Sequence, residues 1–356
     1  MGKRTGPGLP SATAASSQID EILENAKTAQ RKTTTILVLG LPGSGKTTFL
    51  RHLKMIYEPY TETERIQWIN VIQGNLTNAF CALLAALANE SFYPPPIFAY
   101  IQEASSSSQA SLLCPTTTRL FANWFSAVNT QLTLTPLMLE ARTIHFLTRA
   151  PEITQIDYLP SDLDILFSQI ESESEPLAEA EIHVPFASTI RPTSLICVCP
   201  RQSLISAHKW LPIFAYVRDV VFVVNVLEYD SATNMKMTFD FFDQICHNPA
   251  FFKTNIHILM NIPTTFRRKL TLTTTSAPPG SLNTLYPDVP ADYDSDEVKV
   301  LKSLRDRFLS IARRRKYLTR VYIHAVDLVE SQPMRVLMAS FMDTFRDSLA
   351  WGCYMT

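Results

Sequence analysis

The chain lacks the marks of several protein classes. Its six cysteines form no C-x-x-C pair and no Cys/His cluster, which argues against structural zinc and fits a reducing compartment. Its 32 basic and 33 acidic residues nearly cancel, so composition gives no electrostatic reason to expect nucleic acid as a partner. No apolar run reaches the length of a membrane-spanning helix, and the N-terminus lacks a signal-peptide hydrophobic region. A chain of 356 residues can hold one large domain or two.

A lipid anchor at Gly2 is one of two alternatives for the N-terminus. The myristoylation pattern requires Ser or Thr at position 6, and this chain has Gly6, with Thr5 beside it. Lys3 and Arg4 would favour an anionic membrane surface, but no cysteine lies nearby for a second lipid. An ordinary processed start is the other alternative.

The most informative segment matches the phosphate-binding pattern G-x-x-x-x-G-K-[ST]. The run 35–39 before it is apolar and β-branched, as in a buried strand, and apolar residues recur at helical spacing over 48–57. A strand, a Gly-rich loop and a helix N-terminus in this order form a cradle of backbone N–H groups for phosphate. We therefore predict phosphate binding at Gly40, Gly43, Ser44, Gly45, Lys46, Thr47 and Thr48.

Two side chains of this loop carry specific expectations. Lys46 would reach the terminal phosphates of a nucleotide, and the hydroxyl of Thr47 would ligate Mg²⁺. The alternative is a Gly-rich turn that contains an incidental lysine.

The residue pattern of the rest of the chain indicates several distinct segments. Residues 1–16 are rich in Gly, Pro, Ser and Ala and are expected to be disordered, and residues 17–32 indicate an amphipathic helix. Residues 61–169 show helical spacing and few strand-like runs, with helices expected over 118–132 and 137–147. Strand-like runs then return, separated by helical ones. The strands are expected at 193–199, 219–226, 255–261 and 320–325, and the helices at 234–246, 295–314 and 333–349.

This alternation predicts an α/β fold with a mainly parallel sheet covered on both faces. We predict three parts. An N-terminal tail and helix occupy residues 1–32. The P-loop nucleotide-binding domain combines residues 33–60 with 170–356, and an all-helical domain is inserted at 61–169.

Motifs spread over nearly the whole chain resemble the α subunit of heterotrimeric G proteins. They include Tyr158–Leu166, His208–Phe214, Phe241–Asn248 and the closing Cys353–Thr356. The resemblance implies a Ras-like P-loop GTPase domain with an inserted helical domain, and GTP/GDP with Mg²⁺ as cofactors.

The switch motifs depart from the family pattern. The family has a Glu where this chain has Gly43. The best fit to its D-x-x-G-G-Q motif is Val198–Gln202, in which Arg201 replaces the Gly that senses the γ-phosphate. Gln202 alone keeps its type, so it is the candidate catalytic residue that the resemblance implies, with a polar loop residue as the alternative.

The first switch and the base-reading motifs are also altered. The transition-state Arg and the Mg²⁺-ligating Thr of the family fall at Gln169 and Ser172, and no Arg lies between Arg149 and Arg191. The resemblance implies Mg²⁺ ligation by Ser172. The N-K-x-D motif appears as Asn261–Thr264, without its Asp, and the T-C-A-T motif as Ile323–Val326. Asn261 and Ala325 are the predicted base-binding residues, and Thr264 predicts weaker selectivity for guanine.

The resemblance therefore implies a guanine-nucleotide-binding signal transducer that couples a receptor to effectors with weak or impaired hydrolysis. One alternative is a pseudo-GTPase scaffold that binds partners independently of nucleotide, and another is a P-loop small-molecule kinase. The implied partners are a βγ dimer, bound through the N-terminal helix and the region around Trp210, a receptor, bound through the tail 350–356, and an effector protein. The implied location is the cytoplasmic face of the plasma membrane, or the cytoplasm if Gly2 carries no lipid.

Overall fold

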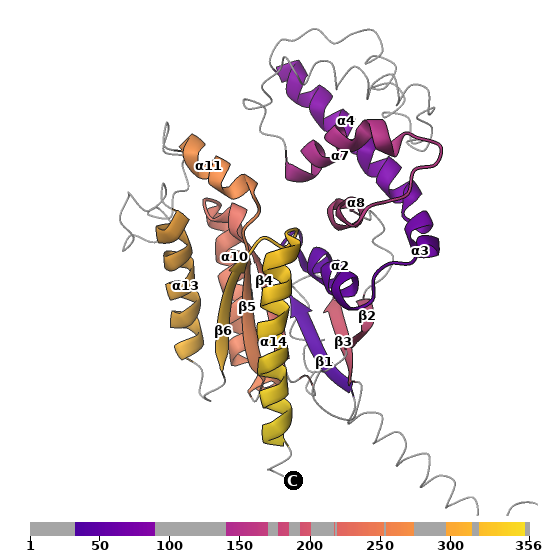
Figure 1. Ribbon diagram of the computed structural model, residues 1–356. Coiled ribbons are helices and arrows are strands. Elements are labelled where there is room, and N and C mark those ends of the chain that lie inside the picture. The colour runs from indigo at the N-terminus through magenta and orange to yellow at the C-terminus, as the bar shows by residue number, and fades with distance from the viewer. Residues whose placement is uncertain are drawn as a thin grey trace, which may run out of the picture.

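The structure is a computed structural model, and it describes residues 33–89, 140–169, 177–184, 193–200, 217, 219–252, 254–273, 297–314 and 320–352. Six strands form one sheet in the order β2-β3-β1-β4-β5-β6 (Figure 1). β2 runs antiparallel to β3, and the other neighbouring strands are parallel. This confirms the predicted α/β fold with a mainly parallel sheet. The bounds are β1 (Thr33–Leu39), β2 (Leu177–Val184), β3 (Thr193–Pro200), β4 (Asp219–Asn225), β5 (Asn255–Asn261) and β6 (Val321–Val326).

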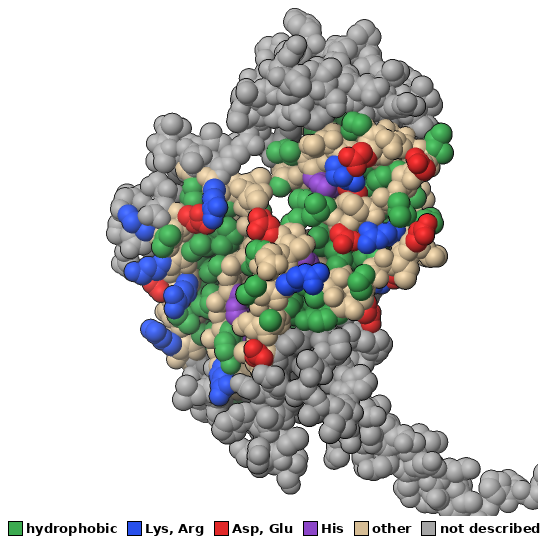
Figure 2. Space-filling model, viewed as in Figure 1, with side chains coloured by type: hydrophobic (Ala, Val, Ile, Leu, Met, Phe, Trp, Pro, Cys, Tyr) green, Lys and Arg blue, Asp and Glu red, His purple; other side chains and the backbone are tan. Residues whose placement is uncertain are grey.

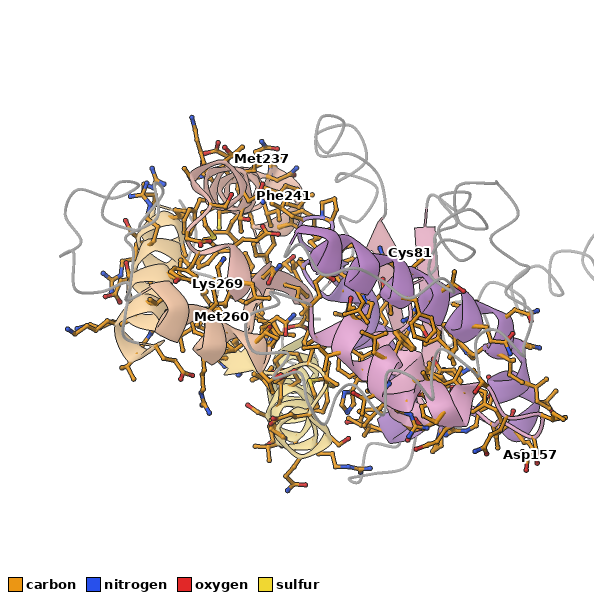
Figure 3. The ribbon with its side chains drawn as sticks, turned by 90° about the horizontal axis from the view of Figure 1, so that it is seen from above. Cys81, Asp157, Met237, Phe241, Met260 and Lys269 are labelled. Carbon is orange, nitrogen blue, oxygen red and sulfur yellow. The ribbon has the colours of Figure 1, made fainter. Side chains whose placement is uncertain are left out.

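Helices cover both faces of the sheet (Figures 1 and 3). On one face, Phe222 and Ile258 pack with the buried residues of α10 (Ala232–His247) and α13 (Glu297–Arg313). On the other face, Val221 and Leu259 pack with α2 (Lys46–Tyr57) and α14 (Ser331–Gly352). Adjacent positions in a strand point to opposite faces, so unbroken apolar strands such as β4 supply both cores. Figure 3 shows the same division on α10, where Phe241 is buried and Met237 is exposed.

Short elements connect these layers. They are the 3₁₀ turns η3 (Val226–Glu228) and η4 (Pro249–Phe251), and α11 (Thr265–Thr273), which follows β5. The helix expected from residue 333 begins at Ser331. Pro333 lies in its first turn, where the missing N–H of proline is tolerated.

A second group of helices has a core of its own. It consists of α3 (Glu62–Gln67), α4 (Ile69–Asn89), α7 (Ala141–Ile153) and α8 (Asp162–Phe167). The buried residues come from α4, α7 and α8, and Met55 of α2 joins them. All of these helices fall within the predicted insertion 61–169, whose exact limits stay a prediction. The principal residues of this core are Ile72, Leu76, Phe80, Phe146, Leu147, Ile153 and Ile165.

One expected helix has different bounds in the structure, one strand was not predicted, and other expectations lie outside the described residues. The helix expected over 137–147 begins at Ala141 and continues through Pro151 to Ile153, because Ala150 and Ile153 are fully buried and their packing outweighs the lost backbone bond. β2 was missed, since its alternation of apolar and charged residues lacks an apolar run. The helices expected at 17–32 and 118–132 lie outside the described residues.

Among the described helices, none has the length and hydrophobicity that a bilayer crossing requires.

Candidate nucleotide-binding site

The loop between β1 and α2 has a conformation that requires glycine at two positions. Gly40 and Gly45 have φ angles of 149° and 105°. A Cβ on Gly40 would lie 2.3 Å from the carbonyl oxygen of Val223, and one on Gly45 would lie 2.7 Å from Cδ1 of Leu328. The loop therefore sits directly against β4 and against the segment after β6. A close backbone approach of this kind is possible only without side chains at these two positions, as in the Gly-rich loops that cradle phosphate.

Lys46 is the first residue of α2 and folds back over this loop. Its Nζ donates hydrogen bonds to the carbonyl oxygens of Gly40 and Leu41, each at 2.8 Å. The ammonium group is thereby held on the loop that leads into α2, whose first-turn N–H groups have no acceptor within the helix. The cradle and the cation fit the phosphates of a nucleotide.

Fewer of the described residues fit a Mg²⁺ ion than fit the phosphates. Thr47 is exposed at the start of α2, so its hydroxyl is accessible to a metal ion. Ser172, the second predicted ligand, lies outside the described residues. Within the described ranges, no three His, Cys, Asp or Glu side chains are grouped as metal ligands. Of the two predicted ligands, the structure therefore describes Thr47 alone, and its hydroxyl is the kind of oxygen ligand that Mg²⁺ takes.

Asn261 joins the phosphate loop to the loops that follow β5 and β6. Its Nδ2 donates to the carbonyl oxygen of Ser44 at 3.3 Å, and its Oδ1 accepts from the N–H of Leu328 at 3.4 Å. All of these groups lie at the carboxyl ends of parallel strands, which is the edge where α/β sheets bind ligands. The structure thus places the predicted base-binding Asn261 beside the predicted phosphate site.

Ala325 is placed differently. It lies within β6, paired with Met260, and not in the loop after the strand. Val326, at the end of β6, and Asp327 accept hydrogen bonds from the loop after β5, and Leu328 donates to Asn261 at the end of β5. Sequence reasoning missed Asp327, although a carboxylate directly after an apolar strand in this fold is a signal of a ligand-edge residue.

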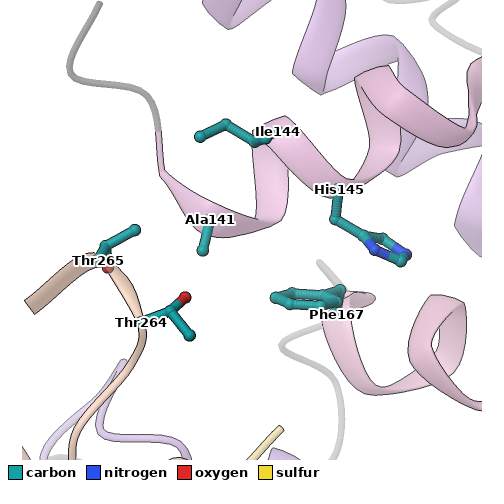
Figure 4. Close-up of a pocket in the computed structure, with 6 residues that line it drawn as sticks. All are labelled: Ala141, Ile144, His145, Phe167, Thr264 and Thr265. Atoms are coloured by element: carbon teal, nitrogen blue, oxygen red, sulfur yellow. The ribbon is translucent and has the colours of Figure 1, made fainter. Parts of the chain in front are cut away.

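A cavity of about 340 Å³ opens between the helical group and the β5–α11 loop. It is lined by Ala141, Ile144, His145, Phe167, Thr264 and Thr265 (Figure 4). The rings of His145 and Phe167 stack with centroids 4.4 Å apart. Figure 2 shows the hollow between the helical group and the sheet with its covering helices. Acidic and basic side chains are interspersed over the visible face.

Asp164 holds the helical wall of this cavity in place. Its buried carboxylate accepts hydrogen bonds from His145, Arg149, Tyr158 and Ser161. Burial acts to raise the pKa of Asp164, but the hydrogen bonds from His145, Arg149 and Ser161 outweigh it and hold the pKa well below its usual range. The carboxylate of Asp164 is therefore ionised at neutral pH and paired with Arg149, and it fixes His145 against Phe167.

The predicted switch position Gln169 follows α8. Arg51 of α2 fixes the preceding residues by donating to the carbonyl oxygens of Ile165, at 3.0 Å, and Ser168. The side-chain oxygen of Gln169 accepts a hydrogen bond from Arg142 of α7. Gln169 thus offers an amide where the resemblance implies an Arg. The candidate catalytic Gln202, Arg201 and the region around Trp210 lie outside the described residues.

Comparison with known proteins decides the family. The sequence model of the G-protein alpha subunit matches residues 13–345. The chain belongs to the G-protein alpha subunit family. Its fold class is therefore that of a Ras-like GTPase domain with an inserted helical domain.

Its relatives of known name are similar at low identity. The chain is 24% identical over 349 residues to a guanine nucleotide-binding protein subunit alpha of Emericella nidulans, with 93% of both chains covered. It is 23% identical over 329 residues to the guanine nucleotide-binding protein alpha-8 subunit of Caenorhabditis elegans, covering 86% of this chain and 85% of that protein. It is also 23% identical over 350 residues to the alpha-1 subunit of Neurospora crassa, with 93% of both covered.

Proposed function

We propose that this G-protein alpha subunit binds guanine nucleotides and transduces signals from a receptor, with weak or impaired GTP hydrolysis. One observation carries the proposal. The phosphate loop, with Lys46 folded over it, is linked through Asn261 to both loops at the ligand edge of the sheet. A family member that had become only a scaffold would have no need of this linkage.

The hydrolytic groups support slow turnover. Phosphoryl transfer depends on charge stabilisation and on a positioned water, and an Arg supplied to the transition state is worth several powers of ten. In this chain Gln169 occupies the position of that Arg, and Arg201 replaces the glycine whose N–H senses the γ-phosphate. Gln202 would orient a water beside these altered neighbours. Thr47 and Ser172 would hold Mg²⁺ without the carboxylate of the usual motif.

The partners follow from the family. We propose that a βγ dimer binds the N-terminal helix and the region around Trp210, and that an effector binds the nucleotide-loaded form. A receptor would bind the tail 350–356, which α14 connects to the sheet and the nucleotide edge. These contacts would hold the protein at the cytoplasmic face of the plasma membrane.

The nucleotide content of the purified protein tests the proposal. The protein is denatured, and the released nucleotide is identified by chromatography, with Lys46→Ala purified in parallel. We expect GDP or GTP from the wild type and little from the variant, and single-turnover hydrolysis slower than in a family member with an intact switch. If neither protein carries or binds a nucleotide, the scaffold function replaces this one.

A further inference from the structure

The loops after β5 and β6 exchange a hydrogen bond at the nucleotide edge. The N–H of Thr264 donates to Oδ2 of Asp327 at 3.0 Å. Thr264 is the residue at which the N-K-x-D pattern loses its carboxylate. The structure therefore brings a carboxylate from the neighbouring loop to the place where the motif lacks one.

The carboxylate of Asp327 is held in a fixed position. Its Oδ1 accepts the N–H of Val329 at 2.9 Å, which closes a tight turn after β6. The next residue, Leu328, is buried against Gly45 and donates its N–H to Asn261. A carboxylate group offers about four lone-pair positions, and these two bonds leave further ones. Asp327 can therefore accept additional donors without leaving its turn.

The surroundings of Asp327 favour a ligand with N–H donors. Burial is the main influence on its pKa and raises it, while the N–H groups of Val329 and Thr264 act in the opposite direction. A partly desolvated carboxylate gains from hydrogen bonds to new donors. Thr264, whose N–H donates to Asp327, lines the cavity between the β5–α11 loop and the helical group.

We propose that Asp327 is the specificity-determining residue for the nucleotide base. Its carboxylate accepts hydrogen bonds from a purine edge that carries adjacent N–H donors. Guanine presents such an edge, with its ring N1–H and its 2-amino group, whereas adenine has an acceptor at N1. The proposal rests on nucleotide binding at the phosphate loop, and it gives the site a source of guanine selectivity in place of the aspartate that is missing at Thr264.

Asp327→Asn tests this assignment, because its side-chain oxygen can still close the turn with Val329, whereas its amide nitrogen donates and no longer accepts the N–H of Thr264. Displacement of a fluorescent GDP by GDP, ADP and XDP is measured for the wild type and the variant. We expect the wild type to prefer GDP over ADP by at least about tenfold, as for sites that hydrogen-bond a substrate group. The Asn amide would instead donate to the 2-carbonyl of xanthine, so the variant should lose affinity for GDP and gain affinity for XDP. Asp306→Asn on the exposed side of α13 is the matched control and should behave as wild type.

A rescue variant distinguishes recognition of the base by Asp327 from a purely structural role in holding the two loops together. Thr264→Asp combined with Asp327→Asn returns a carboxylate to the neighbouring position and should restore the preference for GDP over XDP. Loss of GDP and ADP affinity in equal proportion, without a gain for XDP, would make Asp327 a structural fastener and overturn the inference. A wild type that binds GDP and ADP equally would overturn it as well. A wild type that binds no nucleotide would refute the proposed function itself, which is a distinct result.

Discussion

Asn75 and Gln169 exchange two hydrogen bonds across 94 positions of the sequence. Nδ2 of Asn75 donates to the carbonyl oxygen of Gln169, and Oδ1 of Asn75 accepts the N–H of Gln169, both at 2.9 Å. A side-chain amide that pairs with a backbone in this way imitates one rung of a β-ladder. The pair fixes the direction in which the chain leaves the helical group toward the first switch.

Replacing Asn75 should weaken the attachment of Gln169 to α4. Asn75→Ala removes both hydrogen bonds to the backbone of Gln169, an exposed residue whose freed groups water can reach, so we expect a loss of about 0.5–1.5 kcal/mol of unfolding free energy. Urea unfolding measures the loss, and the release rate of a fluorescent nucleotide should rise in parallel. Gln73→Ala, at an exposed position of the same helix, is the control and should change neither quantity. An unchanged release rate in the destabilised Asn75 variant would show that this pair does not restrain the site.

Restoring an arginine at Gln169 should accelerate hydrolysis. The position lies two residues after the end of α8 and beside Arg142, and the family resemblance assigns it the transition-state charge. Gln169→Arg should raise the single-turnover rate of GTP hydrolysis by at least about tenfold, a small part of what an arginine contributes in intact enzymes. Gln169→Lys is the control, because a point charge lacks the bidentate geometry of a guanidinium group. Equal rates in wild type and Gln169→Arg would mean that the position does not face the γ-phosphate.

Removing the lysine of the phosphate loop should abolish most nucleotide affinity. Lys46 supplies the cation that the structure places on the loop, at 2.8 Å from two of its carbonyl oxygens. We expect Lys46→Ala to weaken fluorescent GDP binding by at least about a hundredfold, because charge-assisted bonds to phosphate are the strong ones. Lys302→Ala, exposed on α13, should bind as the wild type does. Equal binding by wild type and Lys46→Ala would move the phosphate site elsewhere.

The sequence was most informative where the signal is local. The strand, Gly-rich loop and helix around Lys46 follow one another directly, so their pattern predicted both structure and position. Ala325 shows the opposite case. The parallel register pairs Asn261 with Val326, so the loop after β6 begins at Asp327, two residues beyond Ala325, which was predicted to bind the base. A register between strands 65 residues apart depends on packing across the whole sheet, and a single sequence does not specify it.

The histidine at the β6–α14 interface should make stability depend on pH. Burial, together with the nearby His257, lowers the pKa of His324 to about 4. The unfolded chain binds the same proton near pH 6.5. The unfolded state therefore takes up more protons between these values, so stability is fully present above pH 6.5 and declines as the pH falls toward 4.

His324→Phe should remove this part of the pH dependence. Phe keeps a flat ring beside Phe341, whose centroid lies 5.0 Å from that of His324. It also removes a buried ring nitrogen, Nε2, for which the described residues provide no hydrogen-bond partner. The free energy of unfolding in urea, measured at pH 7, 6 and 5, should fall less steeply for the variant than for the wild type. His247→Gln, at an exposed position of α10, should keep the wild-type slope. Identical slopes for wild type and His324→Phe would assign the acid sensitivity of the fold to another group.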